Sequence, residues 1–311
     1  MKKILIVSSN RLGDSILSSG TIPYLKKKYP KISITFLCGP TPASLFKYSN
    51  FVDKIIEVKK KKFSSHWLIA WLLTLFNFWD CVIDFRGTGL AYFLFSRKRI
   101  IKRNKLQDKE NHIVVSISSL LSQKTLSPYI EINKNLVKKK YLQNLKELKK
   151  KKKLIMIAPS ANWIGKIWPI DNFSELISSL TDISYFKNSI FVIVGPKEEW
   201  NLISSLFKSC KGNLFNLVGK TNLAEIFLIM KECDLFIGND SGLMHLSASA
   251  KIPTVGLFGP SDTIRYHPWG NKTLAIKSSK TPEELMGNDD FDPEKCGSLM
   301  NDLSVLEVIK K

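Results

Sequence analysis

The sequence predicts an α/β protein of two domains, each a parallel β-sheet covered by helices on both faces. Short apolar runs alternate with helical stretches, which is the pattern of repeated strand–helix–strand units. The alternation starts again after the lysine run Lys149–Lys153, which predicts a linker or an exposed helix end there. The 311 residues suit two domains, since one domain commonly has about 100–200. We therefore expect domains at 1–150 and 151–311.

In the first half, three apolar runs predict buried parallel strands at Ile4–Val7, Ile32–Leu37 and Cys81–Phe85. A helical stretch lies between the first two, in spite of Pro23. In the second half, strands are predicted at 154–158, 190–194, 214–218, 235–237 and 254–258, and helices at 173–180, 198–207, 223–233 and 243–250. Two such sheets leave a cleft between them at the carboxyl ends of their strands, where ligands of such sheets bind.

The charge is divided unevenly along the chain. The net charge is +20, and residues 1–153 hold 32 Lys and Arg against 9 Asp and Glu. Residues 154–311 hold 15 against 18. The strongly basic half predicts an anionic partner, which is an acidic glycolipid, the negative cytoplasmic leaflet of a membrane, or nucleic acid.

Several classes of protein are excluded by composition. With 44% hydrophobic residues, the chain can bury a core and is not a disordered tail. Its five cysteines have no CxxC pair and it has four histidines, so neither a disulfide framework nor a metal site is expected. The apolar run Trp67–Trp79 is too short to cross a bilayer. A buried helix is its favoured interpretation over an interfacial one.

Three segments that follow predicted strands carry residues suited to chemistry. The first is Arg11-Leu12-Gly13-Asp14. Asp14 is either a helix N-cap or a general base at the cleft. The second runs from Pro159 to Pro169, where Lys166 is either an ordinary solvated lysine or the point charge that holds a phosphate.

The third segment is Gly238-Asn239-Asp240-Ser241-Gly242-Leu243-Met244-His245. Asp240 or Ser241 can cap the following helix, and the small residues Ser241 and Gly242 let an anion reach its free N–H groups. His245 lies one turn further on, and alone it would be a buried core histidine. Neither GxGxxG nor GxxxxGK[ST] occurs, so a dinucleotide fingerprint and a P-loop are unsupported.

Taken together, these segments resemble the bacterial lipopolysaccharide heptosyltransferases, glycosyltransferase family 9. The resemblance runs from residue 1 to about residue 270 and includes the closing helix, Leu303–Ile309. Its most specific part is 234–245, followed by Gly256-Leu257-Phe258-Gly259-Pro260-Ser261. The resemblance implies the GT-B architecture, two Rossmann-like domains facing a central cleft. The last helix could then pack back on the first domain.

The resemblance also implies roles for single residues. Asp14 would deprotonate the acceptor hydroxyl, and Lys166 would neutralise the diphosphate leaving group. The donor, a nucleotide sugar and usually ADP-heptose, would be bound without metal or cofactor by the second domain. Its candidate residues there are Ser160, Asn162, Glu198 or Glu199, Thr221, Asp240, Ser241, Gly242 and His245. The candidate acceptor residues are Arg11 and Arg86, and Arg86-Gly87 stands where many members have Gln-Gly.

The family acceptor is the anionic inner core of lipopolysaccharide, which suits the basic first half. The resemblance thus implies a cytoplasmic enzyme, peripheral on the inner membrane, that does not act on nucleic acid. Trp67–Trp79 and Phe85–Phe95 could help it rest on the membrane. Two alternatives stay open. One is a GT-B transferase with another nucleotide sugar or a capsule acceptor, and the other is a non-catalytic protein that binds anionic glycolipid or nucleic acid.

Overall fold

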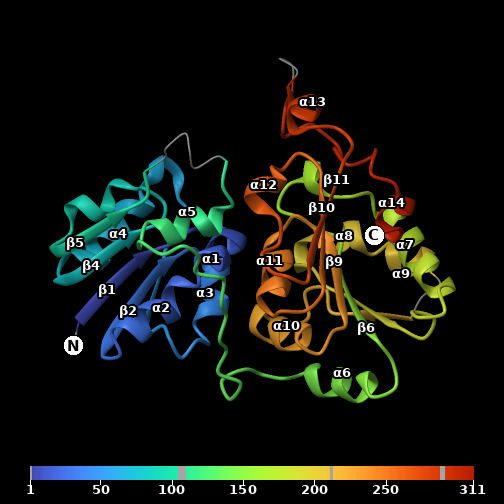
Figure 1. The fold of residues 1–311 in the computed structure, drawn as a ribbon, viewed down its shortest axis with the longest axis horizontal. Coiled ribbons are helices and arrows are strands. Elements are labelled where there is room, and N and C mark those ends of the chain that lie inside the picture. Colours follow the sequence, from blue (N-terminus) through green and yellow to red (C-terminus); the bar gives the residue numbers. More distant parts are fainter. Residues whose placement is uncertain (1, 104–109, 211–212, 288–290) are drawn as a thin grey trace. The chain divides into compact units, whose positions relative to one another are not determined.

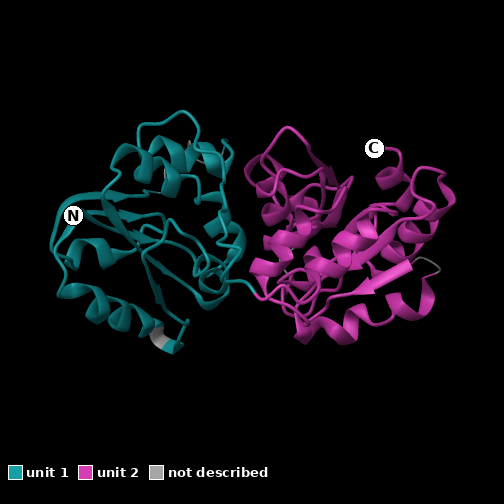
Figure 2. Ribbon diagram, turned by 90° about the horizontal axis from the view of Figure 1, so that it is seen from below, with its two compact units in different colours: residues 1–137 teal, residues 138–311 magenta. Residues whose placement is uncertain are grey.

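The computed structural model describes residues 2–103, 110–210, 213–287 and 291–311, which form two compact α/β units (Figures 1 and 2). Unit 1 is Met1–Val137 and unit 2 is Lys138–Lys311. The division falls before residue 150 because the segment around α6 (Leu142–Lys149) is tied to unit 2. There the buried Glu225 accepts hydrogen bonds from the backbone N–H groups of Tyr141, at 2.6 Å, and Leu142, at 3.2 Å.

Unit 1 is built on a five-stranded parallel sheet with the order β3-β2-β1-β4-β5. The central strand β1 is buried at Ile4–Val7, as an apolar run covered on both faces must be. The strands are β1 (Lys2–Val7), β2 (Ile32–Cys38), β3 (Lys54–Glu57), β4 (Trp79–Asp84) and β5 (Ser96–Ile101). The helices are α1 (Leu12–Leu17), α2 (Thr21–Lys28), α3 (Pro40–Phe46), α4 (His66–Leu75) and α5 (Ile113–Ser119), with short 3-10 helices η1 (Lys62–Ser64) and η2 (Gly89–Phe93).

The three strands predicted for the first half are confirmed as β1, β2 and β4. The sequence did not predict β5, whose residues Arg97, Lys98 and Arg99 are exposed at the edge of the sheet. The helical stretch after β1 is two helices, because residues 18–20 form a turn in which the backbone N–H groups of Ser19 and Thr21 bond to the carbonyls three residues earlier. Pro23 is tolerated as the third residue of α2, where the backbone N–H that it lacks would have no partner in the helix.

Unit 2 is built on a six-stranded parallel sheet with the order β11-β10-β9-β6-β7-β8. The strands are β6 (Leu154–Ala158), β7 (Ile190–Ile193), β8 (Asn213–Asn216), β9 (Leu235–Asn239), β10 (Thr254–Phe258) and β11 (Thr273–Lys277). The helices are α6, η4 (Ile164–Lys166), α7 (Ile170–Asp182), η5 (Lys197–Glu199), α8 (Trp200–Ile203), α9 (Leu206–Ser209), α10 (Leu223–Met230), α11 (Gly242–Ser249), α12 (Thr263–Tyr266), α13 (Pro282–Met286) and α14 (Val305–Ile309).

The five strands predicted for the second half are confirmed as β6 to β10, and β11 is additional. The single helix predicted over 198–207 is wrong. The chain there forms η5, α8 and α9, which are broken at Ser204-Ser205. Serine competes for backbone hydrogen bonds and is a weak helix former, so the apolar pattern did not suffice to keep one helix.

The closing helix α14 packs on α7 within unit 2. Val305 and Val308 of α14 belong to the core cluster that contains Leu176 and Ile177 of α7. Trp168 lies fully buried in the same cluster and donates from its indole N–H to the Leu303 carbonyl at 2.8 Å. The C-terminal residues thus complete the core beneath the second sheet.

The helix expected to be buried in Trp67–Trp79 is instead largely exposed, and that expectation is wrong. In α4 the buried side chains are those of His66, Ala70 and Thr74, whereas Leu72 is 50% exposed. Over the described ranges, none of the helices combines the length and the apolar character that a membrane span requires.

The buried Glu225 supplies a test of how α6 is held. Glu225→Ala removes the acceptor of two backbone N–H groups and of the Thr221 hydroxyl. We expect it to lower the unfolding free energy of unit 2 by about 2–3 kcal/mol, measured by urea denaturation. Glu147→Ala on exposed α6 surface, which removes an ion pair with Lys150, is the matched control. Its expected loss is below about 0.5 kcal/mol, and equal losses for the two variants would contradict this role of Glu225.

Candidate functional site

In each sheet, two neighbouring strands mark the point where the chain reverses its direction of travel across the sheet. They are β1 and β4 in unit 1, and β6 and β9 in unit 2. The loops that leave the carboxyl ends of such strands separate to opposite faces, and the crevice between them is where parallel sheets bind ligands. All three segments singled out in the sequence begin at the ends of these strands. Each unit therefore has its own candidate site.

In unit 2, a buried carboxylate organises the site. Asp240 follows β9 directly, and its Oδ2 accepts hydrogen bonds from Lys166 Nζ and from Ser261 Oγ, both at 2.6 Å. The side chain of Asp240 is 8% exposed, whereas that of Lys166 is 26% exposed. The ammonium group thus sits over the carboxylate on the solvent side. Because an ammonium has three N–H donors and one is used by Asp240, others can serve an anion.

Helix α11 begins immediately after Asp240. Ser241 is its N-cap residue, but its hydroxyl does not cap the helix. The first N–H groups of a helix have no partner within it, and Gly242 adds no side chain of its own over them. His245 is buried, and its Nε2 lies 4.0 Å from Asp240 Oδ1. Oriented N–H groups next to Lys166 form a site suited to an anion.

Two buried polar atoms at this edge have no hydrogen-bond partner among the residues that the structure describes. They are Ser241 Oγ and Asn239 Nδ2. The other side-chain atom of Asn239, Oδ1, accepts from the backbone N–H of Trp168 at 3.1 Å and so fixes the loop that carries Lys166. Buried polar atoms are nearly always paired in proteins, with protein groups or with ordered water, so these two atoms are open to a further polar partner.

The two glutamates that the sequence left as alternatives lie in η5, after β7, and differ in burial. Glu198 is exposed, whereas Glu199 is partly buried. Burial raises the pKa of Glu199. A hydrogen bond with Ser160 lowers this pKa, and the negative charge of Glu198 raises it. Ser160 is buried at the end of β6. Glu199 is therefore the acid that lies beside a predicted ligand-binding residue.

Two further residues predicted to bind the nucleotide sugar are not buried. Asn162 is exposed in the loop after β6. The Thr221 hydroxyl, in the loop after β8, donates to the carboxylate of Glu225. Thr221 is therefore engaged in the contact that holds α6.

In unit 1, Asp14 is not a helix N-cap residue, which was one of the two roles predicted for it. Helix α1 begins at Leu12, its N-cap is Arg11, and Asp14 lies in its first turn. Asp14 Oδ2 accepts a hydrogen bond from Ser9 Oγ at 2.9 Å. This bond holds the half-buried carboxylate at the carboxyl end of β1, while the Arg11 side chain is exposed.

Arg86 lies on the neighbouring loop after β4, which a buried aspartate shapes. Asp84 accepts from the backbone N–H groups of Arg86, Gly87 and Thr88 and from the Thr88 hydroxyl, at 2.7 to 3.1 Å. Burial raises the pKa of Asp84, and these bonds oppose the shift. Gly87 has φ +67°, and an added Cβ would come within 2.5 Å of the Lys102 carbonyl. The exposed Arg86 guanidinium lies 5.2 Å from the Trp67 ring.

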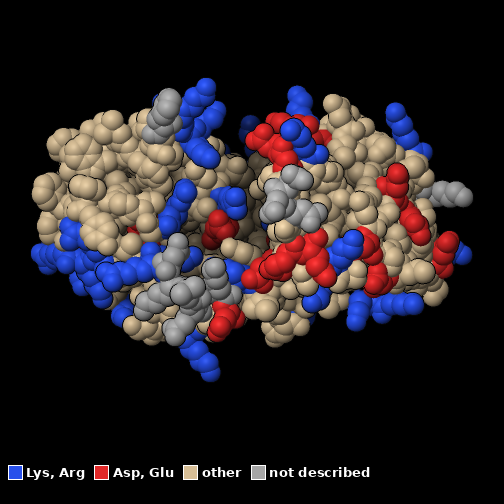
Figure 3. Space-filling model, turned by 90° about the horizontal axis from the view of Figure 1, so that it is seen from above, with Lys and Arg blue, Asp and Glu red and all other residues tan. Residues whose placement is uncertain are grey.

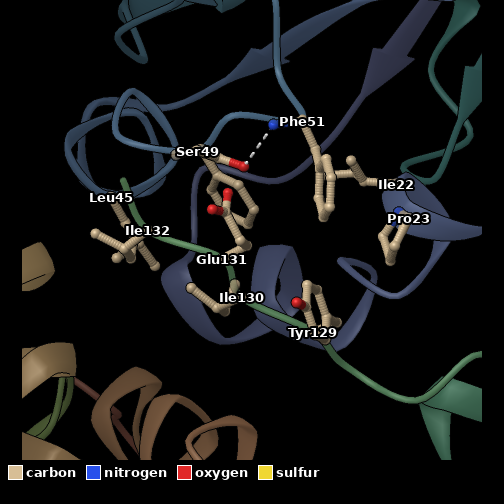
Figure 4. A pocket seen from close by; sticks show the side chains of 10 residues that line it. Ile22, Pro23, Leu45, Ser49, Phe51, Tyr129, Ile130, Glu131 and Ile132 are labelled. Atoms are coloured by element: carbon tan, nitrogen blue, oxygen red, sulfur yellow. Dashed lines mark hydrogen bonds between the residues drawn. The ribbon is translucent and has the colours of Figure 1, made fainter. Parts of the chain in front are cut away.

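A pocket of unit 1 contains none of the predicted site residues. It is lined by side chains from α2, α3 and the segment around Glu131 (Figure 4). The Glu131 carboxylate accepts from the backbone and side-chain N–H groups of Asn50, at 2.9 and 2.8 Å, so it acts in holding two loops together. We assign no function to this pocket.

The sequence pattern assigned no separate role to Ser9, Asn239 or Ser261, which the structure places in the two sites. Ser261 follows the Gly-Pro pair at the end of β10, the neighbour of β9, and this position was a usable signal. Ser9 and Asn239 act through Asp14 and the Lys166 loop, and their partners are visible only in the folded chain.

Comparison with solved structures defines the class of protein. An Escherichia coli ADP-heptose lipopolysaccharide heptosyltransferase II superposes with a TM-score of 0.75 at 18% identity, covering 100% of this chain and 97% of the other. An E. coli heptosyltransferase with ADP-2-deoxy-2-fluoro heptose gives a TM-score of 0.70 at 17% identity, covering 99% and 98%. The two parallel-sheet units are therefore those of the GT-B architecture, as predicted.

The sequence comparisons define the family. The glycosyltransferase family 9 (heptosyltransferase) profile matches residues 87–290. The lipopolysaccharide heptosyltransferase 2 of E. coli is 29% identical over 88% of each chain. This chain belongs to glycosyltransferase family 9 and is a glycosyltransferase.

The raised pKa of Glu199 gives a test of its burial. At neutral pH the folded state holds a partly buried carboxylate, which costs stability that Glu199→Gln recovers. We expect the Tm of Glu199→Gln to exceed that of the wild type near neutral pH. The gain should shrink as the pH falls through the raised pKa and be lost below the ordinary value of 4.5, where the wild type is protonated in both states.

Glu198→Gln, at the exposed neighbouring position, is the matched control for this thermal series and should change the Tm little. A gain in Tm that is equal for the two variants, or that does not depend on pH, would show that Glu199 is not the buried acid.

Proposed function

We propose that this chain is an inverting glycosyltransferase that moves heptose from ADP-heptose to the anionic inner core of lipopolysaccharide. The observation that carries the proposal is the contact of Lys166 and Ser261 with Asp240 at the start of α11. It brings a cation and free helix N–H groups to one edge of the second sheet, and a diphosphate requires both. Membership of the family and a relative that holds an ADP-sugar analogue support the donor.

Unit 2 is the proposed donor-binding unit. The diphosphate would lie at Ser241 and Gly242, with His245 behind them and Ser160 and Asn162 on the adjoining loop. Thr221 would lie towards the base, and Glu199 is preferred to Glu198 for the ribose hydroxyls, since its carboxylate is held beside Ser160.

Lys166 is the proposed group that stabilises the leaving diphosphate. When the bond from the sugar C1 to the diphosphate oxygen breaks, negative charge builds on that oxygen. One N–H of the Lys166 ammonium group can donate to this oxygen while another stays bonded to Asp240. Preorganised donors aimed at developing charge supply most of the rate enhancement in many enzymes. Charge stabilisation is thus supplied by the chain's own residues, and the mechanism calls on no cofactor or metal.

Asp14 of unit 1 is the proposed general base. It takes the proton of the acceptor hydroxyl as that oxygen bonds to C1 on the face opposite the leaving group, which inverts the configuration. The bond from Ser9 leaves the second oxygen, Oδ1, to receive the proton. A positioned base of this kind contributes typically about 10²–10⁴ in rate.

The acceptor is proposed to bind to unit 1, the basic half. The inner core of lipopolysaccharide carries acid sugars and phosphates, which the positive field of residues 1–153 attracts. Arg11 and Arg86 are exposed at the edge that also holds Asp14, and an arginine binds carboxylates and phosphates bidentately. Because the acceptor is a glycolipid, the enzyme is proposed to act at the cytoplasmic face of the inner membrane. Nucleic acid has no place in this reaction.

The role of Asp14 is tested by Asp14→Asn, which keeps the shape and removes the base. We expect kcat to fall by about 10²–10⁴ while the Kd for ADP changes by less than about twofold. Transfer from ADP-heptose is followed by release of ADP. Asp53→Asn, an aspartate before β3 at the opposite edge of the same sheet, is the control. Substantial turnover by Asp14→Asn would remove Asp14 as the base.

The role of Lys166 and the identity of the nucleotide are tested together by calorimetric titration with ADP, UDP and GDP. We expect ADP to bind and Lys166→Ala to weaken it about 10- to 100-fold, the worth of a charge-assisted hydrogen bond. Lys208→Ala, exposed on α9, should leave the Kd unchanged. Preference for UDP or GDP would overturn the ADP-sugar and keep the transferase class. Binding of none of the three would favour a non-catalytic glycolipid-binding protein.

A further inference from the structure

Most of the large aliphatic side chains of helix α4 are exposed to solvent, which is unusual for a helix packed on a sheet. Its buried positions are occupied by His66, Ala70 and Thr74. Its exposed positions are occupied by larger apolar side chains, with exposures of 59% for Leu68, 36% for Ile69, 50% for Leu72 and 50% for Leu73. Phe76, which ends the helix, is 88% exposed. Surface helices normally turn this stripe towards the core.

A second segment extends the exposed apolar surface beside α4. Tyr92, Phe93 and Phe95 are 59%, 70% and 64% exposed. The Trp71 indole N–H donates to the Phe93 carbonyl at 3.0 Å, which joins this segment to α4. The Arg99 guanidinium stabilises the segment by donating to the carbonyls of Ala91 and Leu94. The apolar face, as we call this surface, consists of Leu68, Ile69, Leu72, Leu73, Phe76, Phe78, Tyr92, Phe93 and Phe95.

The segment of the chain that carries the apolar face is strongly basic. Residues 58–103 contain ten Lys and Arg and two Asp. Asp84 is fully buried, and Asp80 is engaged by the Lys3 backbone N–H and by Arg97. The exposed lysines 59–62 lead directly into α4. Figure 3 shows a broad face of unit 1 with few charged side chains, on the left, and Lys and Arg gathered along its borders.

We propose that the apolar face docks unit 1 on an anionic lipid bilayer. Leucine and phenylalanine side chains enter the boundary between headgroups and acyl chains, and the surrounding lysines and arginines meet the lipid phosphates. The charge selects this occupant, because a second copy of the chain would bring an equally basic border against the first. The inference rests on the proposed function only in that a lipid-linked acceptor gives the docking its purpose.

The apolar face is continuous with the proposed acceptor site. Trp67, at the first turn of α4, lies under the Arg86 guanidinium at 5.2 Å. Asp84 fixes the loop that carries Arg86. A bilayer that receives the apolar face therefore lies beside Arg86, and acid sugars at headgroup level come within its reach. Docking would orient the acceptor as well as concentrate it.

The test is sedimentation of the full chain with phosphatidylcholine vesicles, with and without phosphatidylglycerol. We expect at least about tenfold tighter binding to the anionic vesicles and a loss of binding at high salt. The double variant Leu72→Ser/Phe76→Ser should bind them at least about tenfold more weakly, because it removes two inserted side chains. Ile264→Ser/Leu306→Ser, which removes two comparably exposed apolar side chains from unit 2, is the matched control and should bind as the wild type does.

Each other outcome overturns the proposal. Vesicle binding that the two double variants share equally, or no binding by the wild type, shows that the apolar face is not a membrane contact. A dimer in size-exclusion chromatography that Leu72→Ser/Phe76→Ser dissociates, without loss of vesicle binding, assigns the face to a second copy. An unchanged Tm of the variants shows that they are folded. The ADP titration of the same proteins reports separately on the proposed function, because it does not involve the apolar face.

Discussion

Both sites depend on the order in which the chain lays down its parallel strands. Each sheet is begun in its middle, at β1 and at β6, and the chain later returns to the other side of that strand with β4 and β9. The loops at these reversals leave to opposite faces, so the polar residues that follow β1, β4, β6 and β9 are not covered by a neighbouring crossover. Without that order, neither Asp14 nor Asp240 would lie at the crevice of its own sheet.

At the second reversal, one ion pair sets the character of the site. Burying Asp240 removes its charge from water, and that cost is offset only where hydrogen bonds satisfy the carboxylate. Ser261 supplies such a bond from the loop after β10, the next strand in the sheet. As a result, Asp240 fixes the position of the Lys166 ammonium group, and the remaining N–H donors of that group are on the solvent side. A lysine on a flexible surface loop would have to lose that freedom when a ligand binds.

Unit 1 combines a buried polar framework with an unusually apolar exterior. Asp84 shapes the Arg86 loop from inside, whereas α4 buries Ala70 in the core and leaves Leu68, Leu72 and Leu73 exposed. The partly buried Trp67 and Trp71 pack against the same core cluster and hold the helix there. The apolar face therefore contributes nothing to the core. The proposed membrane contact and the proposed acceptor site meet at Trp67 and Arg86.

The sequence by itself determined the two-sheet architecture and the positions of the residues at the strand ends. Short and mainly apolar runs such as Leu154–Ala158 and Thr254–Phe258 favour buried strands, and the predicted bounds agree with β6 and β10. Tertiary structure alone decided what periodicity does not encode. An apolar helix does not say which side has a partner, so α4 was expected to be buried. The burial of Glu199 beside Ser160, and the contact of Ser261 with Asp240 across 21 residues, depend on which strands become neighbours.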